Sequence, residues 1–260
     1  MAWFNRLWQD AVHEFEAVVA AHGEITVGRQ VRSRLGRTGV DEVLASLWAI
    51  DCLNCGGPLS GGNAALSVDD LGYTASAGLF HEHCRASEWN DSGLVVRSSG
   101  GAMLSYHTDC VLIPGRTADG TAAHLPLMVV NPGVESVCIA RGDGAGRGAG
   151  GRWRVVVDQR FLNAGLRSPA DSPAGSPAMT VSGGVATLKG RELSVAFPGH
   201  VIDTYGSKLT KTGRDMVRAD AGITIAVTHA LDPHGFSVDE RKTMLSGDRT
   251  VMGWIPLTAP

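Results

Sequence analysis

The hydrophobic pattern of the chain changes from helical spacing near the N-terminus to short apolar runs further on. Apolar residues recur every three or four positions over residues 3–19, with polar and acidic residues between them and Gly23 after them. This periodicity predicts an amphipathic helix with an aromatic stripe that packs inside the fold or docks a partner. A second apolar helix is predicted over about 40–49, where Asp41 and Glu42 stand near its positive end.

After residue 93 the apolar runs become short and are cut by Gly, Pro and Asn, which is typical of strands. The predicted strands lie at 94–96, 103–104, 110–113, 127–130, 136–139, 153–157, 185–188, 193–197, 223–227 and 251–255. Between the last two, Ser237 and Glu240 have the spacing of a capping box, so a short helix is expected to begin there. We therefore predict an α+β fold, with N-terminal helices followed by a β-rich region of short antiparallel strands.

Changes in composition divide the chain into segments. Ser-Pro occurs three times in residues 168–178, which is typical of an extended linker or a long loop. The glycine-rich run from 141 to 152 predicts a loop between two strands. The predicted organisation is a helical segment 1–50, a Cys/His-containing module 51–92, a β-rich region 93–167, the linker or loop 168–178, and a mostly β region 179–260.

The overall composition is that of a globular protein. Hydrophobic residues make up 43% of the 260 positions and charged residues 19%, which excludes a disordered chain. The 23 Lys and Arg against 26 Asp and Glu give a formal net charge of −3, so a local basic patch is possible but general coating by nucleic acid is not expected. We see no signal peptide and no apolar stretch of membrane-spanning length, and we predict a cytoplasmic protein without membrane contact.

Four Cys and His residues carry the strongest chemical signal. Two residues separate Cys52 from Cys55, and two separate His81 from Cys84. Zn²⁺ takes four nitrogen or sulfur donors in a tetrahedron, and two closely spaced pairs can close that shell. The glycines at 56 and 57 give the first pair the backbone freedom to bend into a knuckle. An odd number of cysteines without an export signal also favours reduced thiols or metal ligands over disulfides.

Residues 52–90 resemble the treble-clef class of zinc fingers. That class combines a Cys-x2-Cys-Gly knuckle, a β-hairpin, and a helix whose first turn carries the second ligand pair. The resemblance implies a hairpin formed by 64–68 and 73–76, a helix that begins near His81 and runs through Trp89, and one structural zinc ion. We therefore expect a treble-clef-like zinc module between the N-terminal helices and the β-rich region.

Other ligand assignments are compatible with the sequence. His83 is a second possible donor beside Cys84, although the i, i+3 spacing on a helix favours His81. The alternative to metal binding is that the cysteines are small buried hydrophobic residues. A second site is conceivable from His107, Cys110, His124 and Cys138. Residues 104–113 have the pattern of a strand, in which residues three apart point to opposite faces. We therefore interpret Cys110 and Cys138 as core residues.

A weaker signal suggests a catalytic site. His229, Asp232 and His234 follow a predicted strand, and such a set can hold a metal ion that activates water. The alternative is a Pro-containing turn with surface histidines. The sequence contains no nucleophile elbow, no His-Glu-x-x-His pair and no dinucleotide-binding fingerprint.

We therefore predict a zinc-binding regulatory or interaction protein rather than an enzyme. Its closed zinc site is expected to scaffold a surface for nucleic acid or for another protein, and the candidates for phosphate contact are Arg29, Arg32, Arg34 and Arg37. A solvated helix face is the alternative interpretation of these arginines. One alternative function is a metal-dependent hydrolase with its site around His229, Asp232 and His234. Another is a structural component of a larger assembly.

Overall fold

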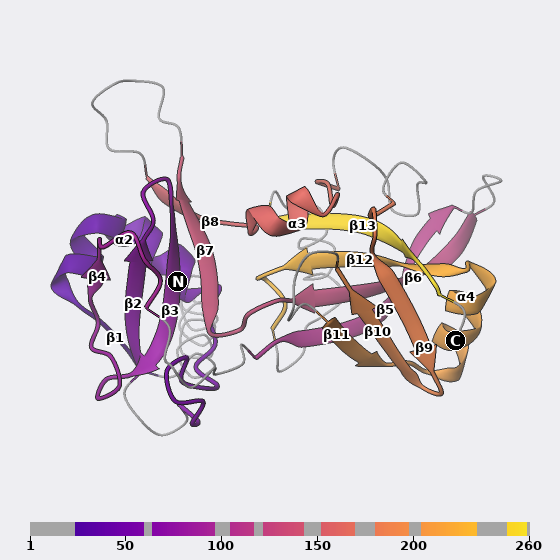
Figure 1. The fold of residues 1–260 in the computed structure, drawn as a ribbon, viewed down its shortest axis with the longest axis horizontal. Coiled ribbons are helices and arrows are strands. Elements are labelled where there is room, and N and C mark those ends of the chain that lie inside the picture. Colours follow the sequence, from indigo (N-terminus) through magenta and orange to yellow (C-terminus); the bar gives the residue numbers. More distant parts are fainter. Residues whose placement is uncertain are drawn as a thin grey trace, which may run out of the picture. The chain divides into compact units, whose positions relative to one another are not determined.

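The computed structural model describes residues 24–59, 64–96, 105–116, 122–142, 152–169, 180–197, 204–232 and 249–258. Thirteen strands and three helices lie in this part of the chain. The chain divides into two compact units: unit 1 comprises residues 1–105 and 134–156, and unit 2 comprises residues 106–133 and 157–260 (Figure 1). The backbone therefore enters unit 2, returns to unit 1, and then completes unit 2.

Unit 1 is built on a six-stranded sheet. In order across the sheet, its strands are β1 (Ile25–Val27), β2 (Ala64–Asp70), β3 (Thr74–His81), β7 (Ser136–Arg141) and β8 (Trp153–Val156), and β4 (Trp89–Asn90) also pairs with β2. Strands β1 and β4 run parallel to β2, and the other pairs are antiparallel. The register of the β2–β3 pair sets Ala64 opposite His81, so the end of β3 lies beside the start of β2.

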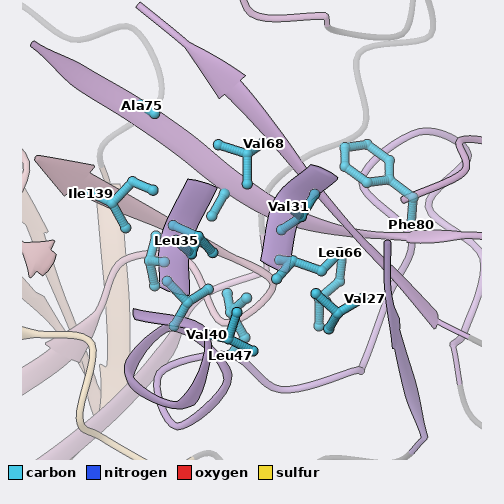
Figure 2. Close-up of a cluster of buried hydrophobic side chains, with 14 of the residues drawn as sticks. Val27, Val31, Leu35, Val40, Leu47, Leu66, Val68, Ala75, Phe80 and Ile139 are labelled. Atoms are coloured by element: carbon cyan, nitrogen blue, oxygen red, sulfur yellow. The ribbon is translucent and has the colours of Figure 1, made fainter. Parts of the chain in front are cut away.

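One helix, α2 (Arg29–Leu44), supplies its apolar side to the core of unit 1. Its buried side chains, among them Val31, Leu35 and Val40, pack in one cluster with Leu66 and Ile139 of the sheet (Figure 2). Gly36 interrupts the helix with φ of 69°, a left-handed conformation that glycine adopts without steric cost. The two halves of α2 can therefore both place apolar residues against the same core.

The described part of unit 2 contains two sheets and two helices. The four-stranded sheet has the order β13 (Thr250–Pro256), β12 (Gly222–Thr228), β6 (Ala122–Asn131) and β5 (His107–Arg116). The three-stranded sheet has the order β11 (Thr204–Lys208), β10 (Glu192–Ala196) and β9 (Val185–Lys189). The helices are α3 (Gln159–Asn163) and α4 (Lys211–Ala219), and Thr210 caps the N-terminus of α4, where its side chain accepts a hydrogen bond from the Gly213 N–H. Strand β12 is buried along its whole length, so it forms the centre of this unit.

The expected α+β fold with N-terminal helices is wrong, because the described chain is mostly β. The helix predicted over 40–49 ends at Leu44 and begins at Arg29, inside the arginine-rich segment. Arginine is a good helix former, but the charged side chains between the apolar residues make the helical spacing of the first half of α2 difficult to recognise in the sequence. Residues 94–96, a predicted strand, are exposed and irregular. The helices predicted over 3–19 and near 237 lie outside the described residues.

Two adjacent residues at the start of β12, Ala221 and Gly222, are expected to respond to substitution with opposite changes in stability. A Cβ atom on Gly222 would overlap the Trp254 ring and lie 2.6 Å from the Ile255 carbonyl oxygen, so Gly222→Ala is expected to destabilise unit 2 by about 1–3 kcal/mol. Ala221 has φ of 50°, which costs an L-residue about 1 kcal/mol, so Ala221→Gly is expected to be stabilising. Urea unfolding measures both effects. Stability changes of the same sign would contradict this interpretation of the turn.

Candidate metal centre

Cys52 and Cys55 lie in a tight loop that precedes β2. The Gly56 N–H donates to the Cys52 carbonyl at 2.8 Å, and the Cys52 N–H donates to the Gly57 carbonyl at 2.8 Å. Gly56 has φ of 68°, which glycine adopts without the penalty that a Cβ atom imposes. These hydrogen bonds hold the loop as the knuckle that the Cys-x2-Cys-Gly-Gly sequence predicts.

His81 and Cys84 lie at the end of β3 and in the turn that follows it. The Cys84 N–H donates to the His81 carbonyl at 2.9 Å, so the two residues are close although no helix is present. The helix expected from His81 through Trp89 is wrong: the chain turns after His81, and Trp89 is buried in β4. A tight turn brings residues i and i+3 together as a helix does, so the ligand spacing is compatible with both. The expected hairpin is present as β2 and β3, but the helix that should carry the second ligand pair is absent, so the treble-clef arrangement is not confirmed.

The four predicted ligand residues converge on one point. One donor atom from each of Cys52, Cys55, His81 and Cys84 lies within 4.8 Å of every other. The His81 Nδ1 atom is 3.4 Å from the Cys55 Sγ atom and 3.9 Å from the Cys84 Sγ atom. Around a tetrahedral zinc ion, sulfur and nitrogen donors are about 3.6 Å apart. The observed donor set therefore fits a Cys₃His zinc shell after only small movements of the side chains.

A hydrogen bond orients the imidazole of His81. Its Nε2 atom is 3.1 Å from the carbonyl oxygen of Pro58, which can only accept a hydrogen bond, so this contact favours the tautomer in which Nε2 carries the proton and Nδ1 can bind a metal. His83 is exposed and stacks on the His81 ring with a centroid distance of 4.9 Å. The structure thus places His81, and not His83, among the converging donors.

The thiols of the cluster have unequal acidities. Burial raises the pKa of Cys52, but hydrogen bonds from the backbone of His81, Cys55 and Asn54 outweigh burial and lower that pKa to about 7. The pKa of Cys84 is raised by burial and by the neighbouring thiols of Cys55 and Cys52. Because a metal binds thiolates, binding displaces thiol protons and becomes weaker as the pH falls.

A buried ion pair supports the turn that carries Cys84. The next residue, Arg85, donates to both carboxylate oxygens of Asp69, at 3.1 and 2.6 Å, and to Glu88 at 2.9 Å. Its guanidinium also lies 5.0 Å from the centre of the Phe80 ring. The side chains of Arg85 and Asp69 are only 8% and 5% exposed, so little water competes for these bonds. The bidentate geometry fixes the turn to β2.

The second metal site, which is the less favoured interpretation of His107, Cys110, His124 and Cys138, does not assemble among the described residues. In the β5–β6 pair, His107 lies opposite Asn131, whereas His124 lies opposite Pro114. Residues 107 and 114 of β5 lie about 23 Å apart along the strand, so His107 is far from His124, which lies opposite residue 114. Cys110 packs against the core of unit 2. Within the described ranges, the cluster around His81 is the only group of His, Cys, Asp or Glu donors close enough to hold a metal ion.

The candidate catalytic residues are only partly described. His229 is buried directly after β12, Asp232 is half-buried, and His234 lies outside the described residues. The His229 ring bonds to the backbone of Gly133, and its Nδ1 atom has no hydrogen-bond partner. Burial lowers the pKa of His229 to about 4, so the ring is neutral at physiological pH. The alternative of a surface histidine is therefore wrong for His229.

The buried His229 predicts a loss of stability in acid. Its pKa is about 4 in the folded protein against an ordinary 6.5, so below pH 6.5 the unfolded chain takes up a proton that the folded chain excludes. Unit 2 is expected to lose about 3 kcal/mol from this group as the pH falls from 6.5 to 4. Urea unfolding of the wild type and of His229→Gln at pH 7 and pH 4 measures the loss. An equal pH dependence in both proteins would refute the effect.

The four predicted phosphate-binding arginines are all exposed on α2. Two of them make bonds within unit 1. The Arg32 Nε atom donates to the Val27 carbonyl at 2.9 Å, and Arg34 forms an ion pair with Asp91 at 3.2 Å. Arg34 also lies over the Trp89 ring, 5.4 Å from its centre. Arg29 and Arg37 are also exposed on the helix.

Comparison with known proteins does not identify the candidate metal centre. No helix within the described residues is long and apolar enough to cross a membrane. No protein-family model, no curated protein and no solved structure matches this chain. The metal centre is therefore inferred from its four donor atoms, the hydrogen bonds that orient them and the chemistry of three thiols with one imidazole.

Proposed function

We propose that this protein binds one zinc ion through Cys52, Cys55, His81 and Cys84, and that the metal holds unit 1 in the form that binds a partner. The observation that carries this proposal is the convergence of three sulfur atoms and the Nδ1 atom of an imidazole whose Nε2 atom faces a carbonyl oxygen. Thiolate and imidazole donors favour zinc over magnesium or calcium, which prefer oxygen. Four protein donors leave no open position for a reacting water molecule, so the assigned role is structural.

The metal would link two segments that are far apart in the sequence. The knuckle at 51–59 has no helix or strand of the sheet within it, whereas His81 ends a long strand of the sheet. Cys52 is buried in the apolar core of unit 1, whereas Cys55 in the same loop is exposed. A zinc ion bound to both cysteines and to His81 therefore fastens the loop to the sheet and restricts its alternative conformations.

Exposed apolar side chains of unit 1 favour a protein as the partner. Tyr73 is 92% exposed in the turn between β2 and β3, and Leu94 is 69% exposed after β4. The segment around Leu94 is held in place, because the Val96 N–H donates to Asp69 at the end of β2. Exposed aromatic and aliphatic residues on ordered backbone are typical of protein contact surfaces.

Nucleic acid is the second candidate partner, because the exposed side of α2 carries arginines. Binding of fluorescent RNA and DNA oligonucleotides at 50 and 200 mM salt separates the two candidates. For a protein partner we expect no salt-sensitive binding of oligonucleotides. Binding that weakens steeply with salt and is lost in Arg29→Ala/Arg37→Ala would make nucleic acid the partner.

X-ray absorption spectroscopy at the zinc edge tests the proposed ligand set. The expected spectrum is that of three sulfur donors at about 2.3 Å and one nitrogen donor at about 2.0 Å. His81→Ala is expected to remove the nitrogen contribution, whereas His83→Ala should leave the spectrum unchanged. A shell dominated by oxygen, or a spectrum that changes only in the His83 variant, would reject the assignment.

A further inference from the structure

Glu135 is a buried carboxylate next to the knuckle, in the segment that precedes β7. Its side chain belongs to a residue that is 1% exposed, and its Oε1 atom accepts a hydrogen bond from the Asp51 N–H at 3.1 Å. Burial raises the pKa of its carboxyl group to about 7. An ionisable group in such a place lowers stability unless its bonds compensate. The bonds that Glu135 makes therefore indicate what it contributes.

The backbone of Glu135 bonds to the strand that carries His81. The Leu79 N–H donates to the Glu135 carbonyl at 3.0 Å, and Leu79 lies two residues before His81. The Leu79 carbonyl in turn accepts from the Leu53 N–H at 3.1 Å, and Leu53 directly follows Cys52. Glu135 thus bonds to the segments of both ligand pairs. Its carboxylate accepts from Asp51, beside Cys52, and its backbone carbonyl accepts from Leu79 in the strand that carries His81.

A second hydrogen bond holds the same side of the knuckle. The Ser105 hydroxyl donates to the Asp51 carboxylate at 3.1 Å, so Asp51 is fixed both through its backbone N–H and through its side chain. Asp51 also bridges to Pro58, whose carbonyl orients the His81 ring. A displacement of Asp51 would therefore move Cys52 and would also disturb the acceptor of the imidazole.

We propose that Glu135 is a positioning residue of the metal centre: its carboxylate holds the Asp51–Cys52 backbone at the distance from β3 that a single zinc ion requires. This inference rests on the proposed zinc function. Groups that do not touch the metal but orient its ligands change metal affinity by about 10–100-fold when they are removed. The loss is expected here because the carboxylate bonds to the residue next to a ligand.

Zinc affinity in the full chain, measured by competition with a chromophoric chelator, tests the proposal. Glu135→Ala is expected to weaken zinc binding by about 10–100-fold, whereas Glu135→Gln keeps an oxygen acceptor and should stay within about threefold of the wild type. Glu42→Ala is the matched control. It removes a carboxylate that accepts the Val155 N–H at 3.0 Å elsewhere in unit 1, and it should also stay within about threefold.

Cobalt substitution gives a readout that general destabilisation does not change. In Glu135→Ala the ligand-field bands of bound Co²⁺ are expected to shift, and Glu135→Gln should restore them. If Glu135→Ala does not fold, Glu135→Asp replaces it, since the shortened carboxylate cannot reach the Asp51 N–H and should weaken binding about tenfold. Unchanged affinity in the Ala or Asp variant, or an equal loss in Glu42→Ala, overturns the proposal. A wild type that binds no zinc instead refutes the zinc function itself.

Discussion

Removal of zinc is expected to open the knuckle of unit 1 and to lower its thermal midpoint. The free energy of binding a structural zinc ion contributes to folding, and it amounts to about 10–16 kcal/mol in small zinc-finger peptides. Unit 1 also has an apolar core that does not depend on the metal, so the sheet should persist while the loop at 51–59 becomes accessible. Limited proteolysis and thermal unfolding, with and without a chelator, measure both effects.

Cys84→Ser should reproduce the effect of the chelator, because it removes one donor from the shell. Cys110→Ser is the matched control, since Cys110 lies in unit 2 outside the cluster and should leave proteolysis of the knuckle unchanged. A knuckle that stays protected after complete removal of the metal would contradict a structural role for zinc. Equal sensitivity of the two cysteine variants would do so as well.

Arg85→Ala is expected to destabilise unit 1 by about 3–5 kcal/mol. Removal of Arg85 leaves the almost fully buried Asp69 without a counter-charge, and among the described residues only the hydrogen bonds from Asn90 and Val96 remain to it. The same substitution frees the turn that carries Cys84, so zinc should also dissociate more readily. Urea unfolding of the zinc-loaded protein measures the stability, and chelator competition measures the affinity.

Arg34→Ala provides the control for this prediction. Arg34 also pairs with an aspartate and contacts an aromatic ring, but its side chain is 36% exposed and its partner Asp91 is 68% exposed. An exposed pair of this kind contributes less than about 1 kcal/mol. Comparable losses of stability in the two variants would show that burial does not determine the strength of the Asp69–Arg85 pair.

The cluster of candidate metal ligands could be predicted from the sequence because the spacing within each pair is local. Cys-x2-Cys and His-x2-Cys each close within one turn of backbone, so each pair is recognisable without knowledge of the fold. The same local spacing led to the wrong helix after His81, since a helix and a tight turn both bring residues i and i+3 together. In the structure the chain turns after His81, and the buried Trp89 lies in strand β4 and not in a helix.

The supporting residues could not be predicted in this way. Glu135 lies 84 positions from Asp51 in the sequence, and Arg85 lies 16 positions from Asp69. Each contact depends on how the strands of the sheet are ordered, and β7 joins the sheet only after the chain has passed through unit 2. Strands of unit 2 could be predicted from the sequence, because runs such as 223–227 and 251–255 are mostly apolar, and the structure confirms them as β12 and β13.

Elemental analysis of the purified protein is the most direct test of the zinc centre. We expect one zinc ion per chain in the wild type and in Cys110→Ser, and a loss of that zinc in Cys84→Ser and in Cys52→Ala. Circular dichroism should show that each compared sample is folded. A folded wild type without zinc, or a Cys84→Ser variant that keeps its full zinc content, would contradict the proposed centre.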